Sequence, residues 1–404
     1  MSCTAIICEY NPFHRGHAYH IARTRAAFPD SPVVCVMSGQ FVQRGEPAIL
    51  SKRARAEAAL CAGASLVVEL PAAYALAGAQ AFADGGAAAA AALGAERLSF
   101  GSESGDTEGL RRTAALTRDE EFRRLLKTAL GTGVGYAAAR AAVVKVLAPE
   151  LERFVTAPND ILAVEYARAA EARGLDLFAV PRVGAPHDGD APRGADAAAD
   201  ADAAAFASAS TLRAYIREGR TDVSAFCPDY AGMILQRETQ EGRAPVTPEA
   251  LDACLLAVLR DCTAEDFVRY ADVSEGLENR LLRALREQGS FDRAVDAAVS
   301  KRYPRARIRR ACWRTFLRIP AAWSKEEPPF LRVLGLTPEG AALLREAKLP
   351  ILTKPAHIAE FPARAREWFA ADERAGDLYA LAYPDAAQRT AGQERRMTPV
   401  FLEG

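Results

Sequence analysis

The first hundred residues alternate between short runs of β-branched and other apolar residues and longer stretches with a helical pattern. Strand-like runs lie at residues 5–8, 33–37, 65–69 and 97–100, and helix-like stretches separate them at residues 17–27, 51–62 and 76–93. Alternation of this kind predicts right-handed βαβ units, and therefore a parallel sheet with helices on both faces. Ligands of such sheets bind beyond the carboxyl ends of the strands, which is where the polar segments of this chain fall.

The pattern changes after this region. Helices are predicted at residues 108–128, 135–146 and 160–173, a strand at 175–181, and a helix that opens at 208–211. Residues 184–207 are rich in Ala, Asp and Gly, which predicts a loop that is disordered or acts as a lid. From about residue 222 the strand signal disappears, and helical runs follow at 249–261, 277–288 and 291–302. We therefore predict an α/β protein with a Rossmann-like domain at 1–220 and a mainly helical domain at 221–404.

Composition adds few constraints. The 404 residues are 50% hydrophobic and 25% charged, which is typical of a globular chain, and the formal net charge of -1 indicates no global affinity for nucleic acid or anionic membranes. The eight cysteines are scattered without a CxxC pair, so we interpret them as reduced, mostly buried thiols. No signal peptide is visible, and no window approaches the roughly 18 apolar residues of a membrane helix. We expect a cytoplasmic protein that is not bound to a membrane.

The strongest local signal is the segment Asn11-Pro12-Phe13-His14-Arg15-Gly16-His17, which follows the first predicted strand. The backbone N–H groups at the start of the next helix form an anion site, and Gly16 lets a phosphate approach the backbone. His14 and His17 are three residues apart and can both donate to charge that develops in phosphoryl or nucleotidyl transfer. Two alternatives stay open: a metal site that includes His20, and polar turn residues without chemistry.

A second anion site is predicted at residues 208–213, with the sequence SASTLR. Hydroxyls at the start of a helix, with Arg213 one turn inside, can cradle phosphate. An ordinary helix N-cap explains the same residues. The first site makes the functional interpretation credible, because one triphosphate needs donors at both ends. We predict that His14, His17, Ser210 and Arg213 stabilise the charge of the reaction.

Other charged residues near the predicted strand ends have two interpretations each. Lys52 and Arg55, one helical turn apart, neutralise pyrophosphate or an RNA backbone, or else they form a solvated helix face. Glu9 and Glu69 follow strands and orient donors or a Mg²⁺ ion, or else they form buried pairs with an arginine such as Arg44.

Taken together, the motifs resemble those of the bacterial tRNA(Met) cytidine acetate ligases, within the HIGH-motif nucleotidyltransferase superfamily. The matching blocks cover most of the chain: EYNPFHRGH at 9–17, SGQFVQRGEP at 38–47, SKRAR at 51–55, VELP at 68–71, FGSESGD at 100–106, PNDIL at 158–162, STLR at 210–213, EGLEN at 275–279, SKRY at 300–303 and LTK at 352–354. The resemblance implies a nucleotidyltransferase-type enzyme that uses ATP and acetate to acetylate the wobble cytidine of elongator tRNA(Met). It implies an acetyl-adenylate intermediate, release of pyrophosphate, and then acyl transfer to the 4-amino group of the base.

The resemblance also implies which residues bind ATP. The family's ATP-binding positions correspond in this sequence to Ile7, Glu9, Tyr10, Asn11, Pro12, Phe13, His14, Gly16, His17, His20, Gly101, Asn159 and Arg182. Two departures affect this prediction: Pro186-His187-Asp188 with the Ala/Asp-rich loop after Arg182, and Asp160 where relatives often carry a second amide. Mg²⁺ is a candidate cofactor beside ATP, and no resident metal site and no protein partner are expected.

A tRNA-modifying enzyme needs a basic surface, and residues 301–318 are the best candidate. This stretch contains eight basic residues and no acidic one. We predict RNA contacts for Lys301, Arg302, Arg305, Arg307, Arg309 and Arg310. A stacking role for Tyr303 and a solvated helix face are both open, and Trp313 is assigned to the core. Two other functions stay open: a metabolite adenylyltransferase of the same superfamily, and a catalytically silent RNA-binding protein.

Overall fold

The computed structural model describes residues 2–182, 208–220, 223–271, 273 and 276–403. The predicted loop at 184–207 lies outside these residues, as does Glu275 of the EGLEN block. The strands are β1 (Cys3–Cys8), β2 (Val33–Ser38), β3 (Phe41–Val42), β4 (Glu46–Pro47), β5 (Leu66–Leu70), β6 (Ala95–Ser102), β7 (Asp176–Pro181), β8 (Leu331–Leu336), β9 (Ile351–Leu352) and β10 (Val400–Phe401).

The helices of the first half are α1 (Arg15–Ala27), α2 (Lys52–Cys61), α3 (Ala72–Ala75), α4 (Ala79–Ala92), α5 (Thr107–Leu116), α6 (Glu120–Gly131), α7 (Tyr136–Leu147), α8 (Pro158–Glu171) and α9 (Ala209–Arg217). Those of the second half are α10 (Asp229–Gln240), α11 (Asp252–Asp261), α12 (Ala264–Ala271), α13 (Leu277–Glu287), α14 (Phe291–Ala298), α15 (Arg305–Leu317), α16 (Pro338–Leu343), α17 (Ala363–Ala380) and α18 (Gln393–Arg396).

The main sheet has the strand order β10-β8-β5-β2-β1-β6-β7. The five strands from β5 to β7 are parallel, as predicted, and β1 pairs with β2 on one side and β6 on the other. The chain therefore reverses its direction of winding beside β1, and such a switch point opens a crevice at the carboxyl ends of the strands.

Alternating side chains of the buried strands feed two cores. Ile7, Val34 and Val36 belong to the core that α4 and α8 cover, whereas Ile6 and Cys35 belong to the core on the side of α1 and α2. This alternation is the ordinary pleat of a strand, and it explains why the strand runs of the sequence are apolar throughout. The predicted α/β fold with helices on both faces is confirmed.

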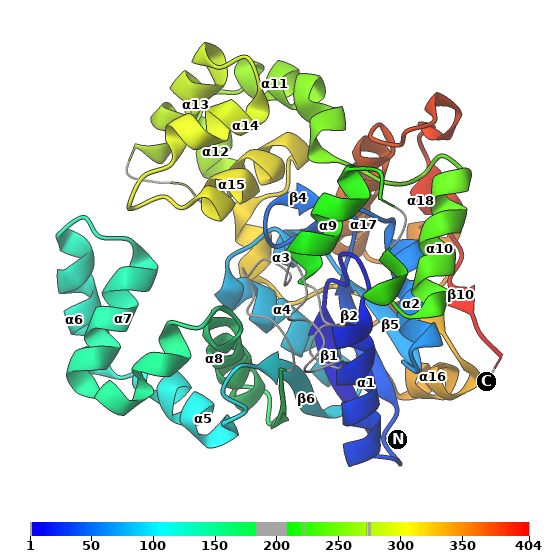
Figure 1. Cartoon of the computed structure of the whole chain (residues 1–404), viewed down its shortest axis with the longest axis horizontal. Coiled ribbons are helices and arrows are strands. Elements are labelled where there is room, and N and C mark those ends of the chain that lie inside the picture. Colours follow the sequence, from blue (N-terminus) through cyan, green and yellow to red (C-terminus); the bar gives the residue numbers. More distant parts are fainter. Residues whose placement is uncertain (1, 183–207, 221–222, 272, 274–275, 404) are drawn as a thin grey trace, which may run out of the picture.

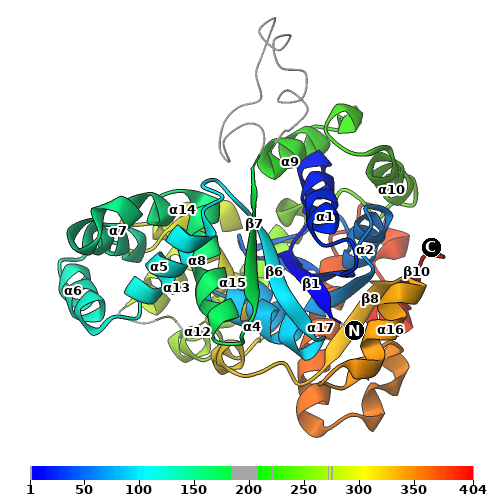
Figure 2. The same cartoon turned by 90° about the horizontal axis from the view of Figure 1, so that it is seen from below.

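Two helical groups extend from this sheet. Figure 1 shows α11–α15 gathered at one end of the molecule, with α6 and α7 below them in that view. Figure 2, turned by 90°, shows α1 on the opposite side of the sheet from α4 and α15. The predicted helical runs after residue 249 correspond to α11, α13 and α14.

The expectation that strands end near residue 222 is wrong. β8 inserts beside β5 in the antiparallel sense, β10 pairs with β8 on its other side, and β9 also pairs with β8. The predicted division at residue 220 therefore does not coincide with an edge of the sheet. The strand formed by LRVLGL was missed for two reasons: the segment is short, and its polar residue, Arg332, interrupts the apolar run although almost the whole strand is buried.

Candidate active site

A cavity of about 420 Å³ lies at the carboxyl ends of β1, β6 and β7, where the strand order reverses. The start of α1, the β3–β4 hairpin, α4, α8 and the start of α9 complete its wall. The predicted site residues that line it are Ile7, Glu9, Tyr10, Asn11, His14, Gly16, His17, His20, Gly101, Asn159, Arg182, Ser210 and Arg213. Pro12 and Phe13 lie behind the wall instead, against α2 and α10, and the Phe13 side chain is buried there.

The start of α1 fixes both histidines of the motif. The Nδ1 atom of His14 accepts a hydrogen bond from Gly16 N at 3.1 Å, and the Nδ1 atom of His17 accepts one from His14 N at 3.3 Å. The two rings are stacked with centroids 3.7 Å apart. In a neutral ring whose Nδ1 accepts, the proton is on Nε2. Each ring therefore keeps an Nε2–H donor for a ligand.

The imidazoles of this cluster are held neutral. Burial, with the nearby Arg182 and Arg213 charges, lowers the pKa of His14 to about 3. Burial, followed by His14 and His20, lowers the pKa of His17 well below its ordinary value. The ring of His20 hydrogen-bonds Ser99 Oγ through Nε2 at 2.9 Å, and burial lowers its pKa to about 4. Among the described residues no group of three His, Cys, Asp or Glu side chains could hold a metal ion.

The second predicted motif meets the first across the cavity. Ser208 caps α9 by accepting from Thr211 N at 3.1 Å, which leaves Ser210 free of the capping role. Arg213 Nη1 donates to Asn11 O at 2.8 Å, and Arg213 Nη2 lies 3.4 Å from Ser210 Oγ. Two segments about 200 residues apart in sequence therefore present hydroxyl, imidazole and guanidinium donors to one space.

The β3–β4 hairpin adds residues that were not predicted for the site. Arg44 Nη1 lies 3.5 Å from Ser210 Oγ, and Glu46 pairs with Arg213 Nε at 3.2 Å. Gln43 N donates to Glu9 Oε1 at 2.6 Å. These residues belong to the block SGQFVQRGEP, which was among the matching motifs. The sequence of that block alone does not show that it folds back over β1.

Glu103 was also missed, and it explains the role of residues 159 and 160. Its Oε1 accepts from Asn159 Nδ2 at 2.5 Å, which orients the amide at the rim of the cavity. The buried Asp160 carboxylate accepts from Glu103 N at 3.1 Å and from Ser104 N at 3.2 Å. Asp160 therefore holds the turn after β6, and an aspartate at this position has a structural function.

Both interpretations of Lys52 and Arg55 are wrong, because both residues are 0% exposed. Lys52 Nζ lies 2.7 Å from Glu69 Oε1 and also pairs with Glu394. Arg55 donates to the carbonyls of Leu50 at 3.0 Å, Ser38 at 3.1 Å and Glu9 at 2.6 Å, and also to that of Gly39. The two cations thus hold the protein together beneath the site. Glu69 forms the buried pairs that were the alternative interpretation, with Lys52 and with an arginine, Arg332 at 3.6 Å, and only Glu9 of the two predicted carboxylates lines the cavity.

The basic stretch at 301–318 divides into three environments. Arg309 donates to Gly45 O at 3.1 Å and Arg310 to Gln43 O at 2.9 Å, so both bind the β3–β4 hairpin. Arg305 pairs with Asp292 at 3.1 Å and with Asp296, and Arg314 is buried. Trp313 is 0% exposed, which confirms its assignment to the core.

The basic residues Lys301, Arg302 and Arg307 lie around Tyr303, at the start of the stretch. This ring is 7% exposed and lies beneath the guanidinium groups of Arg302 at 5.9 Å and Arg307 at 5.4 Å from its centroid. It therefore packs against cations and not against an open surface. Lys301 is exposed beside it.

Comparison with known proteins agrees with this geometry. The model of the HIGH Nucleotidyl Transferase family matches residues 1–394. The tRNA(Met) cytidine acetate ligase of Fervidobacterium nodosum is 34% identical, with 98% of each chain covered. That of Caldanaerobacter subterraneus is 36% identical, covering 96% of this chain and 97% of the relative. The chain belongs to this ligase family.

Solved structures show the same fold. TmcAL of Thermotoga maritima bound with alpha-thio ATP has a TM-score of 0.90 and 30% identity, with 100% of both chains covered. The apo form of that protein has a TM-score of 0.91 and 31% identity, again over 100% of both chains. Within the described residues of our chain, no helix is long and apolar enough to span a membrane.

Proposed function

We propose that this protein acetylates the wobble cytidine of elongator tRNA(Met), with ATP and acetate as its other substrates. The observation that carries the proposal is the meeting of the α1 and α9 helix starts over one cavity. Membership of the acetate ligase family supports the reaction, and the solved TmcAL complex with alpha-thio ATP supports the nucleotide.

In the first step an acetate oxygen attacks the α-phosphorus of ATP. A P–O bond forms to acetate, the bond to the bridging oxygen breaks, and pyrophosphate leaves with the bonding electrons. Little covalent help is needed from the protein, but the developing charge must be stabilised. The Nε2–H groups of His14 and His17, the Ser210 hydroxyl and the Arg213 guanidinium are the donors that we assign to this charge.

The neutral state of the histidines suits this role. A neutral imidazole donates through Nε2–H without giving up a proton, so the donor is in place before the charge develops. Gly101, Asn159 and Arg182 line the other side of the cavity, where we place the nucleoside part of ATP. Mg²⁺ remains a candidate companion of the ATP phosphates, and chelation by EDTA in the assay below tests whether it is required.

The RNA requires a basic approach to the cavity. We propose Lys301, Arg302 and Arg307 as its contacts, because they lie on the α14–α15 connection and the start of α15. Arg309 and Arg310 belong to the same helix but hold the hairpin. Because the substrate is a tRNA, we expect the enzyme to act in the cytoplasm.

The test supplies purified protein with ATP, ¹³C-acetate and unmodified elongator tRNA(Met), followed by digestion and mass spectrometry of the nucleosides. We expect labelled N4-acetylcytidine, and its loss in His17→Asn, which keeps an acceptor for His14 N but removes the Nε2 donor. Consumption of ATP without labelled RNA would favour a metabolite adenylyltransferase. No change in ATP or RNA would favour a silent RNA-binding protein.

A further inference from the structure

Glu9 is a predicted cavity residue whose carboxylate has one oxygen bound by the protein and one oxygen without a hydrogen bond among the described residues. It follows β1 directly, is partly exposed and lines the cavity. Its Oε1 accepts from Gln43 N at 2.6 Å and from Ser38 Oγ at 3.4 Å. Within the described part of the chain, its Oε2 has no hydrogen bond and its carboxylate has no ion pair, although Arg55 and Arg213 lie nearby. Those two arginines donate to the backbone carbonyls of Glu9 and Asn11 instead.

The carboxylate is held in place from the side of α15. Arg310 donates to the carbonyl of Gln43, whose N–H binds Glu9 Oε1. Arg309 donates to Gly45 O, and a Cβ on Gly45 would lie 2.7 Å from Arg309 Cβ. Gly45 also has φ of +74°, so a glycine is needed both for this turn and for the close approach of α15. The helix of the predicted RNA-binding stretch thus fixes the hairpin that orients Glu9.

Part of the cavity wall near Glu9 is apolar. Ile7 precedes it on β1, and Phe82, Phe100 and Tyr166 line the same cavity. Burial is the largest influence on the Glu9 carboxyl and raises its pKa above the ordinary value. A carboxylate in such surroundings is a better proton acceptor than one in water.

We propose that Glu9 is the general base of the acyl-transfer step and accepts a proton from the 4-amino group of the cytidine through Oε2. The inference rests on the proposed function. In this step the N4 lone pair attacks the acetyl carbonyl carbon and a C–N bond forms. The C–O bond to the phosphate of AMP breaks, AMP leaves with the bonding electrons, and the N4 proton passes to Oε2.

The same contact distinguishes cytosine from uracil. The 4-amino group of cytosine is a donor that a carboxylate accepts from, whereas uracil presents a carbonyl oxygen at that position. A carboxylate facing that oxygen would be left with two acceptors and no proton between them. One residue thus serves the chemistry of the step and the choice of base.

The experiment separates the two half-reactions. Acetate-dependent exchange of labelled pyrophosphate into ATP, without RNA, reports on adenylate formation, and single-turnover acetylation of tRNA reports on the complete reaction. For Glu9→Gln we expect acetyl transfer to fall about 10²- to 10⁴-fold further than exchange does, the usual contribution of a general base. For Glu9→Asp, which keeps a carboxylate, we expect transfer to recover in part relative to exchange. Glu108→Gln, an exposed carboxylate on α5, is the matched control and should change neither.

Three results decide the outcome. Transfer by Glu9→Gln at the wild-type rate overturns the inference. Equal losses of exchange and transfer in both Glu9 variants also overturn it, because Glu9 would then serve ATP binding or the fold. If wild type itself exchanges pyrophosphate but forms no acetylcytidine, the proposed function fails, and the inference fails with it.

Discussion

The starts of helices α2 and α9 share the same local sequence signal but lie in opposite environments. Each has a serine N-cap: Ser51 Oγ accepts from Ala54 N at 3.3 Å, and Ser208 Oγ accepts from Thr211 N at 3.1 Å. Basic residues follow within the first two turns of both helices. Lys52 and Arg55 of α2 are buried and satisfied by the protein, whereas Arg213 of α9 borders the cavity.

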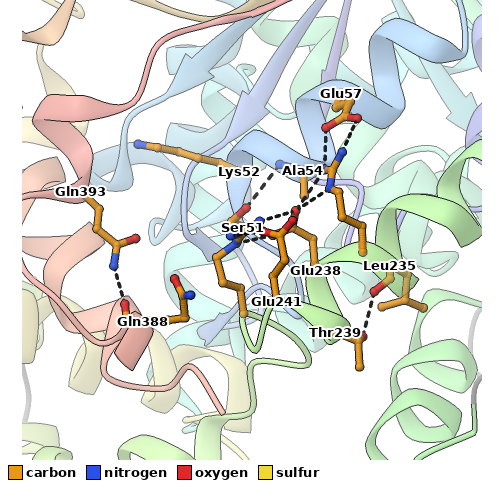
Figure 3. Close-up of polar contacts among 12 residues, drawn as sticks. Ser51, Lys52, Ala54, Glu57, Leu235, Glu238, Thr239, Glu241, Gln388 and Gln393 are labelled. Carbon is orange, nitrogen blue, oxygen red and sulfur yellow. Dashed lines mark hydrogen bonds and ion pairs between the residues drawn. The ribbon is translucent and has the colours of Figure 1, made fainter. Parts of the chain in front are cut away.

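The charged residues that surround each helix start cause this difference. Lys52 meets Glu69 of β5 and Glu394 of α18, and Arg332 of β8 joins both carboxylates, so no charge is left for a ligand. The far side of α2 is fixed as well: Figure 3 shows Glu57 and Glu238, which Arg237 links at 2.7 Å and 3.0 Å, away from the Lys52 side chain. Around α9, by contrast, the two cations Arg213 and Arg217 share the Glu46 carboxylate, and Glu9 lies near Arg213 without an ion pair to it. A helix start becomes a ligand site where the protein leaves its charges incompletely compensated.

The largest effect is expected from Lys52→Met. Removing one partner of a buried ion cluster leaves carboxylates without compensation, which costs about 3–5 kcal/mol of unfolding free energy. Urea denaturation measures this loss. Arg53→Met is the control, because Arg53 is exposed on the same helix and its loss should change stability by less than about 0.5 kcal/mol. Equal effects of the two changes would contradict the distinction between the helix starts.

The next largest effect is expected at His14, where two amide substitutions can be compared. His14→Asn keeps an acceptor for Gly16 N but places nothing at Nε2, so we expect exchange of pyrophosphate to fall about 10²- to 10³-fold, the effect of losing one preorganised donor. His14→Gln carries an N–H near the Nε2 position and should recover part of the rate. Unchanged thermal unfolding in both variants would assign the loss to the site. Faster pyrophosphate exchange in His14→Asn than in His14→Gln would contradict our assignment of Nδ1 as the acceptor and Nε2 as the donor.

Asp372 gives an intermediate effect that depends on pH. Burial, and then the charge of Glu69, raises the pKa of Asp372 to about 7. A folded-state pKa above the unfolded value of about 3.9 means that the stabilising contribution is present at low pH and is lost as pH rises toward 7. Asp372→Asn keeps an acceptor for Ala72 N, so it should match wild type below about pH 4, become progressively more stable than wild type between pH 4 and 7, and be more stable by about 4 kcal/mol at pH 7 to 8. Parallel stability curves of the two proteins would contradict the protonated state of this carboxyl.

The smallest effect compares one serine from each helix start. Ser210→Ala removes a proposed phosphate donor and should lower kcat/KM for ATP about tenfold, or about 1.4 kcal/mol, with little change in stability. Ser51→Ala removes a helix cap and should cost about 1 kcal/mol of stability with unchanged kinetics. A lower kcat/KM for ATP in Ser51→Ala, or an unchanged one in Ser210→Ala, would contradict the distinction between the two helix starts.

The contrast between the α2 and α9 helix starts also explains which parts of the structure could be predicted from the sequence. The strands β1, β2, β5, β6 and β7 and the helix starts at α1 and α9 were predictable, because each depends on local periodicity, caps and motif spacing. Lys52 was misinterpreted because its partner Glu394 lies more than 300 residues further along the chain. β8 was missed for a related reason: its place beside β5 and its buried Arg332 follow from that same remote cluster.

The basic stretch at 301–318 shows the limit for binding surfaces. Eight basic residues without an acidic one favoured an RNA surface, but Asp292 and Asp296 from the preceding helix pair with Arg305, and backbone carbonyls of the hairpin accept from Arg309 and Arg310. Charge counted along a segment omits partners that the fold brings to it. What the sequence could not indicate is therefore which cations are already satisfied.

The most direct test of this account follows the oxygen atoms of acetate. Wild-type protein is incubated with ATP, elongator tRNA(Met) and acetate labelled with ¹⁸O at both oxygens, and the AMP is analysed by mass spectrometry. If the cavity forms acetyl-adenylate, one acetate oxygen bonds to the α-phosphorus and stays there after transfer, so each AMP carries one ¹⁸O atom for each acetylcytidine formed. Unlabelled AMP beside labelled acetylcytidine, or ¹⁸O in phosphate or pyrophosphate, would contradict attack of acetate at the α-phosphorus.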